Sequence, residues 1–233
     1  MDSGTRMLVQ MAGARRFNRW MADTIAPFVS GAVLEAGAGI GNLTEFLYRS
    51  ENRYIAADLE DEHLALLSKR LQSCRGLTIA KCDLLNSNDL APYRDQMDTV
   101  VCLNVLEHVE DDIAGLRGLL SCLRCGGRAV ILVPQGPRAY GSLDRVLGHH
   151  RRYTKPELHA KLLAAGFHLN RMVEFNRITY PGWVLNSRTF RRITLSDMQL
   201  RLFDCLVPLW RRIDRFLPWP STSLIAIASR DGC

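Results

Sequence analysis

Three glycines at alternate positions follow a short apolar run that contains an acid near its end. Gly37, Gly39 and Gly41 come directly after the run at residues 33–36, and a helical pattern begins at Thr44. Because glycine has no Cβ, such a turn can adopt backbone angles closed to other residues and can let a ligand approach the main chain. The stretch predicts a strand, a tight turn and a helix that hold a nucleotide-like ligand. An ordinary strand-to-helix turn is the alternative.

Polar residues recur at the ends of three further apolar runs. Asp58, which lies 17 residues beyond Gly41, ends one run, while Asp83 and Asn104 follow the next two. A carboxylate at the position of Asp58 can accept hydrogen bonds from both hydroxyls of a ribose. Asp83 could accept a hydrogen bond from an adenine amino group while Leu84 packs on the ring. Solvated acids at strand ends are the alternative.

A second set of reactive side chains could move a proton. The candidate general bases are His108, Tyr140, His149, His150 and Tyr153. His149 or His150 could deprotonate a substrate, and Arg151 or Arg152 could bind a carboxylate or phosphate. The alternative is that these residues only tie a loop to the following helix. The remaining histidines are expected to have no role: His63, His159 and His168.

Alternating strands and helices must position these groups. Strands are predicted at residues 32–36, 54–58, 77–81, 97–103, 128–133, 168–175 and 222–228. Helices are predicted over residues 5–29, from the glycine turn to about 49, and over 62–74, 111–123 and 155–165. This order predicts an α/β fold, with an open, Rossmann-like, mostly parallel sheet of seven strands and helices on both faces. The carboxyl ends of its strands are where a ligand is expected.

The predicted domain organisation has three parts. Residues 1–31 form an amino-terminal helical cap, residues 32–177 and 222–233 form the ligand-binding domain, and residues 178–221 form an insertion. The insertion is too long for a structureless loop in a compact domain. It begins with aromatic residues and a basic stretch that includes Arg191 and Arg192.

An amphipathic helix is predicted in the second half of the insertion. Its apolar residues recur at helical spacing, and Pro208 is expected to kink it: Leu202, Phe203, Leu206, Leu209, Trp210, Ile213 and Phe216. The helix could cover the ligand as a lid, pack on the sheet or the leading helix, form a homodimer, or contact a membrane surface. Trp210, Phe216 and Trp219 alternate with arginines, which favours the membrane, whereas Asp204 and Asp214 argue against it.

The composition limits which binding partners and which cellular location are expected for this protein. The net charge is +6 and the pI about 9.1, but the arginines are dispersed as pairs and form no basic block. A nucleic-acid partner is therefore not expected, whereas an anionic substrate or membrane surface is compatible. Seven cysteines, an odd number, favour reduced thiols. With no signal-peptide pattern and no apolar run long enough to cross a bilayer, the expected location is the cytoplasm.

A metal site is not predicted. Cys122 and Cys125 have the spacing of a metal or redox pair, but no second pair of cysteines or histidines accompanies them. The two glycines that follow are expected to end a helix.

Taken together, the motifs resemble those of class I S-adenosylmethionine-dependent methyltransferases, in a small-molecule branch similar to methyltransferase types 11, 12 and 23. The resemblance covers about residues 30–175 and is carried by Leu34–Gly41, Ala57–Leu59, Cys82–Leu84 and Asn104–His108. The spacing Gly-x-Gly-x-Gly favours the methyl donor over a dinucleotide, whose binding motif more typically carries its third glycine one position later.

The resemblance implies a set of donor-binding residues. These are Glu35, Ala36, Gly37, Ala38, Gly39, Gly41, Asp58, Leu59, Cys82, Asp83, Leu84, Asn104, Val105 and His108. It implies ribose binding by Asp58, and it places Asn104 and Val105 below the sulfonium and His108 at the mouth of the site. It also places His149, His150 and Tyr153 where a catalytic base could face the methyl group.

The implied reaction is transfer of the sulfonium methyl group of S-adenosylmethionine to an oxygen, nitrogen or carbon of a small organic acceptor, which leaves S-adenosylhomocysteine. The acceptor could be a natural-product, quinone-like or lipid-linked compound, and the protein a monomer or homodimer. Methyl transfer needs alignment of the reacting atoms and exclusion of water, and an oxygen or carbon nucleophile also needs a base. The alternatives are a nicotinamide-dependent oxidoreductase and a non-catalytic donor-binding protein.

Overall fold

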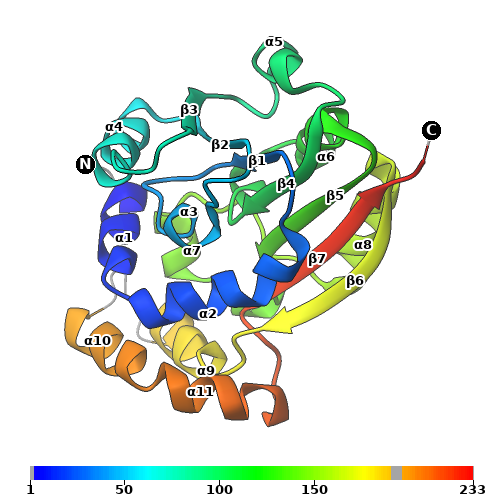
Figure 1. Ribbon diagram of the computed structural model, residues 1–233. Helices are drawn as coiled ribbons and strands as arrows, with labels where there is room; N and C mark the ends of the chain where they lie inside the picture. The colour runs from blue at the N-terminus through cyan, green and yellow to red at the C-terminus, as the bar shows by residue number, and fades with distance from the viewer. Residues whose placement is uncertain (1–2, 190–195, 233) are drawn as a thin grey trace.

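A seven-stranded sheet forms the centre of the computed structural model, which describes residues 3–189 and 196–232 (Figure 1). Residues 190–195, which include the predicted basic Arg191 and Arg192, lie outside the described part. The strand order is β3-β2-β1-β4-β5-β7-β6; β7 pairs antiparallel with both β5 and β6, and the other neighbouring strands pair parallel. The strands are β1 Val33–Ala36, β2 Tyr54–Asp58, β3 Leu77–Lys81, β4 Met97–Leu103, β5 Leu123–Pro134, β6 Phe167–Phe175 and β7 Ser223–Arg230. The predicted fold is therefore confirmed.

The register of the parallel strands brings the motifs together. Ala36 at the end of β1 lies opposite Ala57 of β2 and Cys102 of β4. The carboxyl ends of these three strands therefore meet at one edge of the sheet. Strands β1 and β2 are buried along their whole length, which is why they read as continuous apolar runs.

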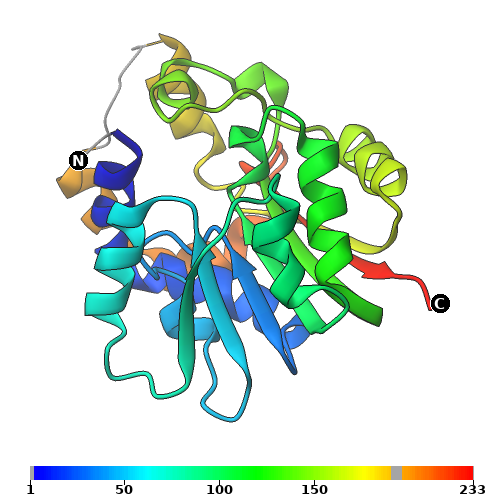
Figure 2. The same cartoon turned by 90° about the horizontal axis from the view of Figure 1, so that it is seen from above.

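Helices cover both faces of the sheet, as the view from above shows (Figure 2). One face packs against α5 Ser87–Leu90, α6 Asp112–Cys122 and α8 Lys155–Ala165. The other packs against α2 Arg15–Ile25, α3 Thr44–Leu47 and α4 Asp61–Arg70, with α1 Ser3–Ala12 beside them. The remaining helices are α7 Ser142–Val146, α9 Tyr180–Val184, α10 Asp197–Cys205 and α11 Val207–Ile213. None of the described helices is long and apolar enough to cross a membrane.

Two predicted helices are each divided in the structure. The helix expected over residues 5–29 breaks at Gly13 into α1 and α2, and the side chain of Asn18 caps the break by donating to the carbonyl of Met11. The helix expected around Pro208 is two helices, α10 and α11, because proline cannot donate the backbone bond that would continue a helix and instead favours its first turn.

Two expectations about residues in β5 were wrong, one about a pair of glycines and one about a cysteine. The two glycines after Cys125 were expected to end a helix, but α6 ends at Cys122 and both glycines belong to β5. The expectation of reduced thiols is wrong for Cys125, which is disulfide-bonded. Its exposed position on β5 leaves the sulfur open to oxidation. Among the described residues, the free thiols are those of Cys74, Cys82, Cys102, Cys122 and Cys205.

Candidate active site

The glycine turn has the conformation that its composition predicts. Gly37, Gly39 and Gly41 have φ values of 79°, 56° and 82°, in the region that favours glycine. A Cβ on Gly37 would lie 2.1 Å from Cγ2 of Val105, and one on Gly41 would lie 2.6 Å from a methyl carbon of Leu67. The turn therefore needs glycine both for its angles and for its close packing against Val105, just after β4, and Leu67 of α4.

Asp58, at the tip of β2, is held by three donors. Its carboxylate accepts from the backbone N–H of Gly39 at 2.7 Å and of Glu60 at 3.0 Å, and lies 3.0 Å from Nδ1 of His63. The other ring nitrogen of His63 lies 3.1 Å from the hydroxyl of Thr5. His63, expected to have no role, thus connects Thr5 of α1 to Asp58 at the end of β2. His63 follows Asp58 by five residues in the sequence, and this spacing could have indicated the contact between them.

Glu35 is buried inside β1 rather than open to a ligand. Its carboxyl accepts hydrogen bonds from the hydroxyls of Thr44 at 2.7 Å and Tyr54 at 2.9 Å. Burial raises the pKa of Glu35 to about 7, although both hydroxyls oppose the shift. The carboxyl thereby ties the start of α3 to the strand that carries the glycine turn.

The predicted adenine-binding residues have unequal exposure. Cys82 and Leu84 are buried, and Leu84 belongs to the core on the face covered by α6. Asp83 is half-buried and accepts a hydrogen bond from the backbone of Leu85. Among the apolar side chains near these strand ends, Leu59 and Leu85 are 50% and 51% exposed. Of the alanines in the turn, Ala36 and Ala38 are buried.

The end of β4 leads into a short 3-10 turn that carries two ionisable side chains. Asn104 has a φ of 55°, uncommon for a residue other than glycine, and turns the chain away from the sheet. Glu107 follows on the turn Leu106–His108 and is fully buried. Both of its carboxyl oxygens lack a hydrogen-bond partner among the described residues. Burial raises the pKa of Glu107 to about 8.

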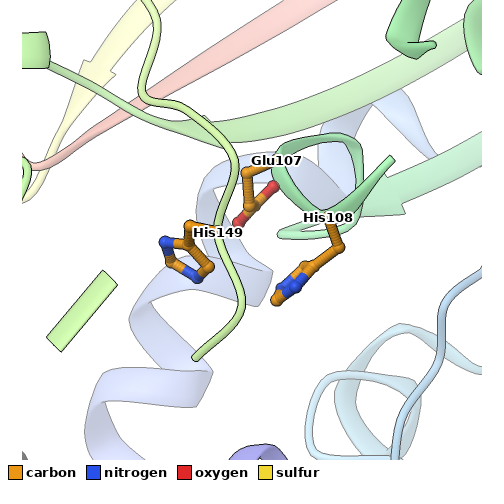
Figure 3. A group of neighbouring side chains, drawn as sticks. All are labelled: Glu107, His108 and His149. Atoms are coloured by element: carbon orange, nitrogen blue, oxygen red, sulfur yellow. The ribbon is translucent and has the colours of Figure 1, made fainter. Parts of the chain in front are cut away.

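Glu107, His108 and His149 form a cluster, although His149 comes from a distant loop (Figure 3). One ligand-type atom from each residue lies within 4.8 Å of those of the others, and the two imidazole rings meet edge to face at 4.8 Å. Desolvation and the neighbouring His149 lower the pKa of His108 to about 4. The three side chains also have the chemistry of a divalent metal site, a grouping that the sequence analysis did not predict.

A buried carboxylate orients His149. Asp144 accepts from Nδ1 of His149 at 2.9 Å, from Nε of Arg152 at 2.7 Å and from the backbone of Gly141 at 2.9 Å. Burial alone would raise the pKa of Asp144, but these donors hold it below its ordinary value. The guanidinium of Arg152 in turn lies 4.6 Å from the ring centre of Trp183 in the insertion. Sequence reasoning did not identify Asp144.

Other predicted residues of this loop have structural partners. Arg152 is buried, and Arg151 pairs with Asp112 at 2.9 Å, so neither is free to bind a substrate anion. Tyr153 is fully buried with its hydroxyl 2.8 Å from Asp112, and burial raises its pKa. His150 is exposed, and its backbone donates to the carbonyl of Glu107. The structure therefore brings the rings of His149 and His108 into contact, whereas Tyr153 is buried against Asp112 and His150 is exposed.

Two parts of the insertion have different contacts. The segment from α9 to Ser187 supports the His149 loop, because Ser187 accepts from Ser142 at 3.0 Å and Trp183 stacks on Arg152. Part of the apolar stripe of α10 and α11 packs beside α2, with the Phe203 and Phe17 ring centres 5.5 Å apart and Trp210 against the same core cluster. Leu202, Leu209 and Phe216 of the predicted stripe are instead exposed.

Comparison with known proteins identifies related sequences. Residues 34–129 match a family described as "Methyltransferase domain". The chain is 29% identical to a ubiquinone biosynthesis O-methyltransferase of Xanthomonas euvesicatoria pv. vesicatoria, over 70% of this chain and 72% of the relative. It is 28% identical to the protein of the same name from Aeromonas salmonicida, over 52% of this chain and 51% of that relative.

Comparison of folds identifies solved structures with a similar fold. An S-adenosylmethionine-dependent methyltransferase from Mesorhizobium loti superposes with a TM-score of 0.60 at 17% identity. The match covers 90% of this chain and 96% of the other. At that identity the likeness concerns the fold alone.

Proposed function

We propose that this chain is a class I S-adenosylmethionine-dependent methyltransferase that methylates an oxygen atom of a small molecule, with His149 as the general base; the matched methyltransferase family and the relatives support this proposal. A hydroxyl or phenol loses its proton only with difficulty near neutral pH, so its methylation benefits from a base, whereas a neutral amine does not need one. The single observation that supports this choice is the contact between Asp144 and His149, 2.9 Å long.

Asp144 would fix the tautomer and the orientation that His149 needs to act as a base. A carboxylate on Nδ1 keeps the proton on that nitrogen and leaves Nε2 able to accept one, and it stabilises the imidazolium that results. Asp144 is buried and bound by Arg152 and Gly141 as well, so it cannot rotate away from the ring. We assign His108, whose pKa lies well below neutrality, to the wall of the site as a neutral ring.

The donor-binding residues fit S-adenosylmethionine at the edge where β1, β2 and β4 end. The bound donor supplies a methyl group on a positively charged sulfur, already activated for transfer. The main chain at Gly37 and Gly39 would hold the amino-acid end of the donor, while Asp58 would accept from the ribose hydroxyls. Val105, packed against Gly37, would exclude water from the reacting atoms.

For the acceptor we propose an aromatic compound with a phenolic hydroxyl. Support comes from the relatives named ubiquinone biosynthesis O-methyltransferase and from the imidazole ring of His108, which lies 4.8 Å from the ring of the proposed base His149. A lipid tail on the acceptor, the oligomeric state and a cytoplasmic location stay predictions. So does the role of residues 178–221 as a lid.

The proposal is tested by radiolabelled methyl transfer to matched phenols, anilines and carbon acids. We expect methylation of a phenol, and a loss of kcat of about 100-fold or more in His149→Asn. His150→Asn is the matched control, because this adjacent exposed histidine should be dispensable. Calorimetry should show S-adenosylhomocysteine bound by both variants and not by Asp58→Ala. Methylation of anilines alone, or full activity of His149→Asn, would refute the proposed base.

A further inference from the structure

Arginines crowd the groove between α2 and α11. The groove has a volume of about 850 Å³, and six arginines line it: Arg15, Arg16, Arg19, Arg211, Arg212 and Arg215. The aromatic rings of Trp20 and Phe46 form part of its wall. The proposed chemistry at His149 does not use this groove, so its charge calls for a separate explanation.

Acidic neighbours neutralise only part of this charge. Glu45 pairs with Arg15 at 2.5 Å, Asp23 pairs with Arg211 at 2.6 Å, and Asp204 lies 4.0 Å from Arg16. Arg19 and Arg212 form no ion pair with the described residues. Glu45 is further shared with Arg70, outside the groove. The groove therefore keeps an excess of positive charge.

Two acidic residues that argued against membrane contact in the sequence analysis, Asp204 and Asp214, are buried. Asp204 is buried and accepts from the backbone N–H of Phe17 at 2.8 Å, while Asp214 is buried and accepts from that of Ile178 at 2.9 Å. Between residues 198 and 220, the exposed charged residues are thus all basic: Arg201, Arg211, Arg212 and Arg215. Asp197, the first residue of α10, is the one exposed acid among the described residues of these helices, and it accepts a hydrogen bond from the side chain of Gln10 at 2.5 Å.

Exposed apolar side chains lie on α10, on α11 and on the 3-10 turn Asp214–Phe216 that follows them. Four are largely uncovered: Met198 at 77%, Leu202 at 63%, Leu209 at 48% and Phe216 at 71%. The guanidinium of Arg215 lies 4.6 Å from the ring centre of Phe216, so an apolar group and a groove cation are in direct contact. The tryptophans are not part of this surface, because Trp210 packs against the core and Trp219 donates to the carbonyl of Arg177.

Helices α10 and α11 lie end to end beneath α2, along one side of the molecule (Figure 1). We propose that this basic edge, formed by Arg15, Arg16 and Arg19 of α2 and by the exposed residues of 198–216, docks on the surface of an anionic phospholipid bilayer. Basic residues are attracted to anionic headgroups, while leucine, methionine and phenylalanine enter the boundary between headgroups and acyl chains. The combination favours a bilayer over a nucleic acid, which would not require the exposed apolar residues.

Co-sedimentation with vesicles tests this proposal. The full chain is mixed with vesicles of phosphatidylcholine alone, or of phosphatidylcholine and phosphatidylglycerol in equal parts. We expect binding only to the mixed vesicles, weakened by salt. Arg212→Glu with Arg215→Glu should lower the partition coefficient roughly 30-fold or more, from about fivefold for each basic residue near an anionic surface. Phe216→Ser should lower it further.

A matched control separates this surface from net charge. Arg75→Glu with Arg94→Glu reverses two exposed arginines outside the basic edge and lowers the net charge by the same amount, from +6 to +2. This control should bind nearly as the wild type does. Equal losses in both double variants, or no vesicle binding by the wild type, would overturn the proposal.

Two further outcomes would assign the surface to another partner. Binding to a DNA duplex without vesicle binding would overturn the proposal in favour of a nucleic acid. A dimer in light scattering that Phe216→Ser dissociates, again without vesicle binding, would overturn it in favour of a second copy of the chain. Thermal melts and calorimetry with S-adenosylhomocysteine show whether each variant is folded, so failure here leaves the proposed methyl transfer untouched.

Discussion

Asp144 and His149 come from the two ends of one short segment, yet the hydrogen bond between them is the contact that organises the candidate site. The carboxylate is fully buried, and the same oxygen that contacts Nδ1 of His149 accepts from Nε of Arg152. Arg152 is fixed in turn by the carbonyl of Gln135 and by the ring of Trp183. The orientation of His149 therefore depends on β5, α7 and the insertion together.

Replacement of Asp144 by asparagine should lower kcat by about 100-fold or more. The amide can donate to Nδ1 and so favour the wrong imidazole tautomer, without a change of side-chain size. Steady-state kinetics over a range of pH measure the effect. Because a structural defect would also lower donor affinity, binding of S-adenosylhomocysteine serves as the control and should change little. An unaltered pH–rate profile in this variant would contradict a positioning role for Asp144.

Replacement of Gly37 by alanine should destabilise the protein more than the same change at Gly76. Both glycines have positive φ, 79° and 88°, so both substitutions carry the backbone cost of about 1 kcal/mol. Only Gly37 adds a steric overlap, since its Cβ would lie 2.1 Å from Val105 whereas nothing lies within 4 Å at Gly76. Urea unfolding should show a loss above about 2 kcal/mol for Gly37→Ala. Similar losses in both variants would exclude the contact with Val105 as the cause.

Stability should fall as pH rises toward 8, in part through Glu107. Its pKa is raised to about 8 in the folded state by burial, whereas an exposed glutamate titrates near 4.5. Between these values the unfolded chain has lost a proton that the folded chain retains, so unfolding becomes easier with rising pH. The decline should be on the order of 2–4 kcal/mol. Denaturant unfolding at pH 5 and pH 8 should show a shallower decline in Glu107→Gln, and equal slopes would count against this assignment.

Removal of divalent cations should leave the methylation rate unchanged. Glu107, His108 and His149 have metal-ligand chemistry, but a base at His149 requires that Nε2 be free to accept a proton. Dialysis against a chelator followed by a rate assay tests this point. Loss of activity, restored by added magnesium or zinc and not by potassium, would instead show that the cluster holds a metal ion.

Much of the fold was predictable because it depends on local patterns. The bounds of β2, β3 and β4 agree with the predicted residues 54–58, 77–81 and 97–103. Helix α8 begins with the capping pair Thr154 and Glu157 and ends at Gly166 with a φ of 98°, as the residue types indicate. The predicted helix boundaries were wrong near Gly13 and Pro208, where one expected helix is two short helices. Each of these residues allows either a bend or a break, and the sequence does not say which occurs.

The sequence by itself determined which residue types stand at the turn and at the strand ends. It places glycines where the chain must turn tightly, and Asp58, Asp83 and Asn104 where strands end. These features follow from backbone geometry and residue spacing, which act over a few positions. The tertiary structure decided which side chains meet. It placed His63 on Asp58, Asp144 on His149, and Asp204 and Asp214 inside the molecule. Such contacts depend on the direction of each side chain in the packed fold, which residue types and spacing do not specify.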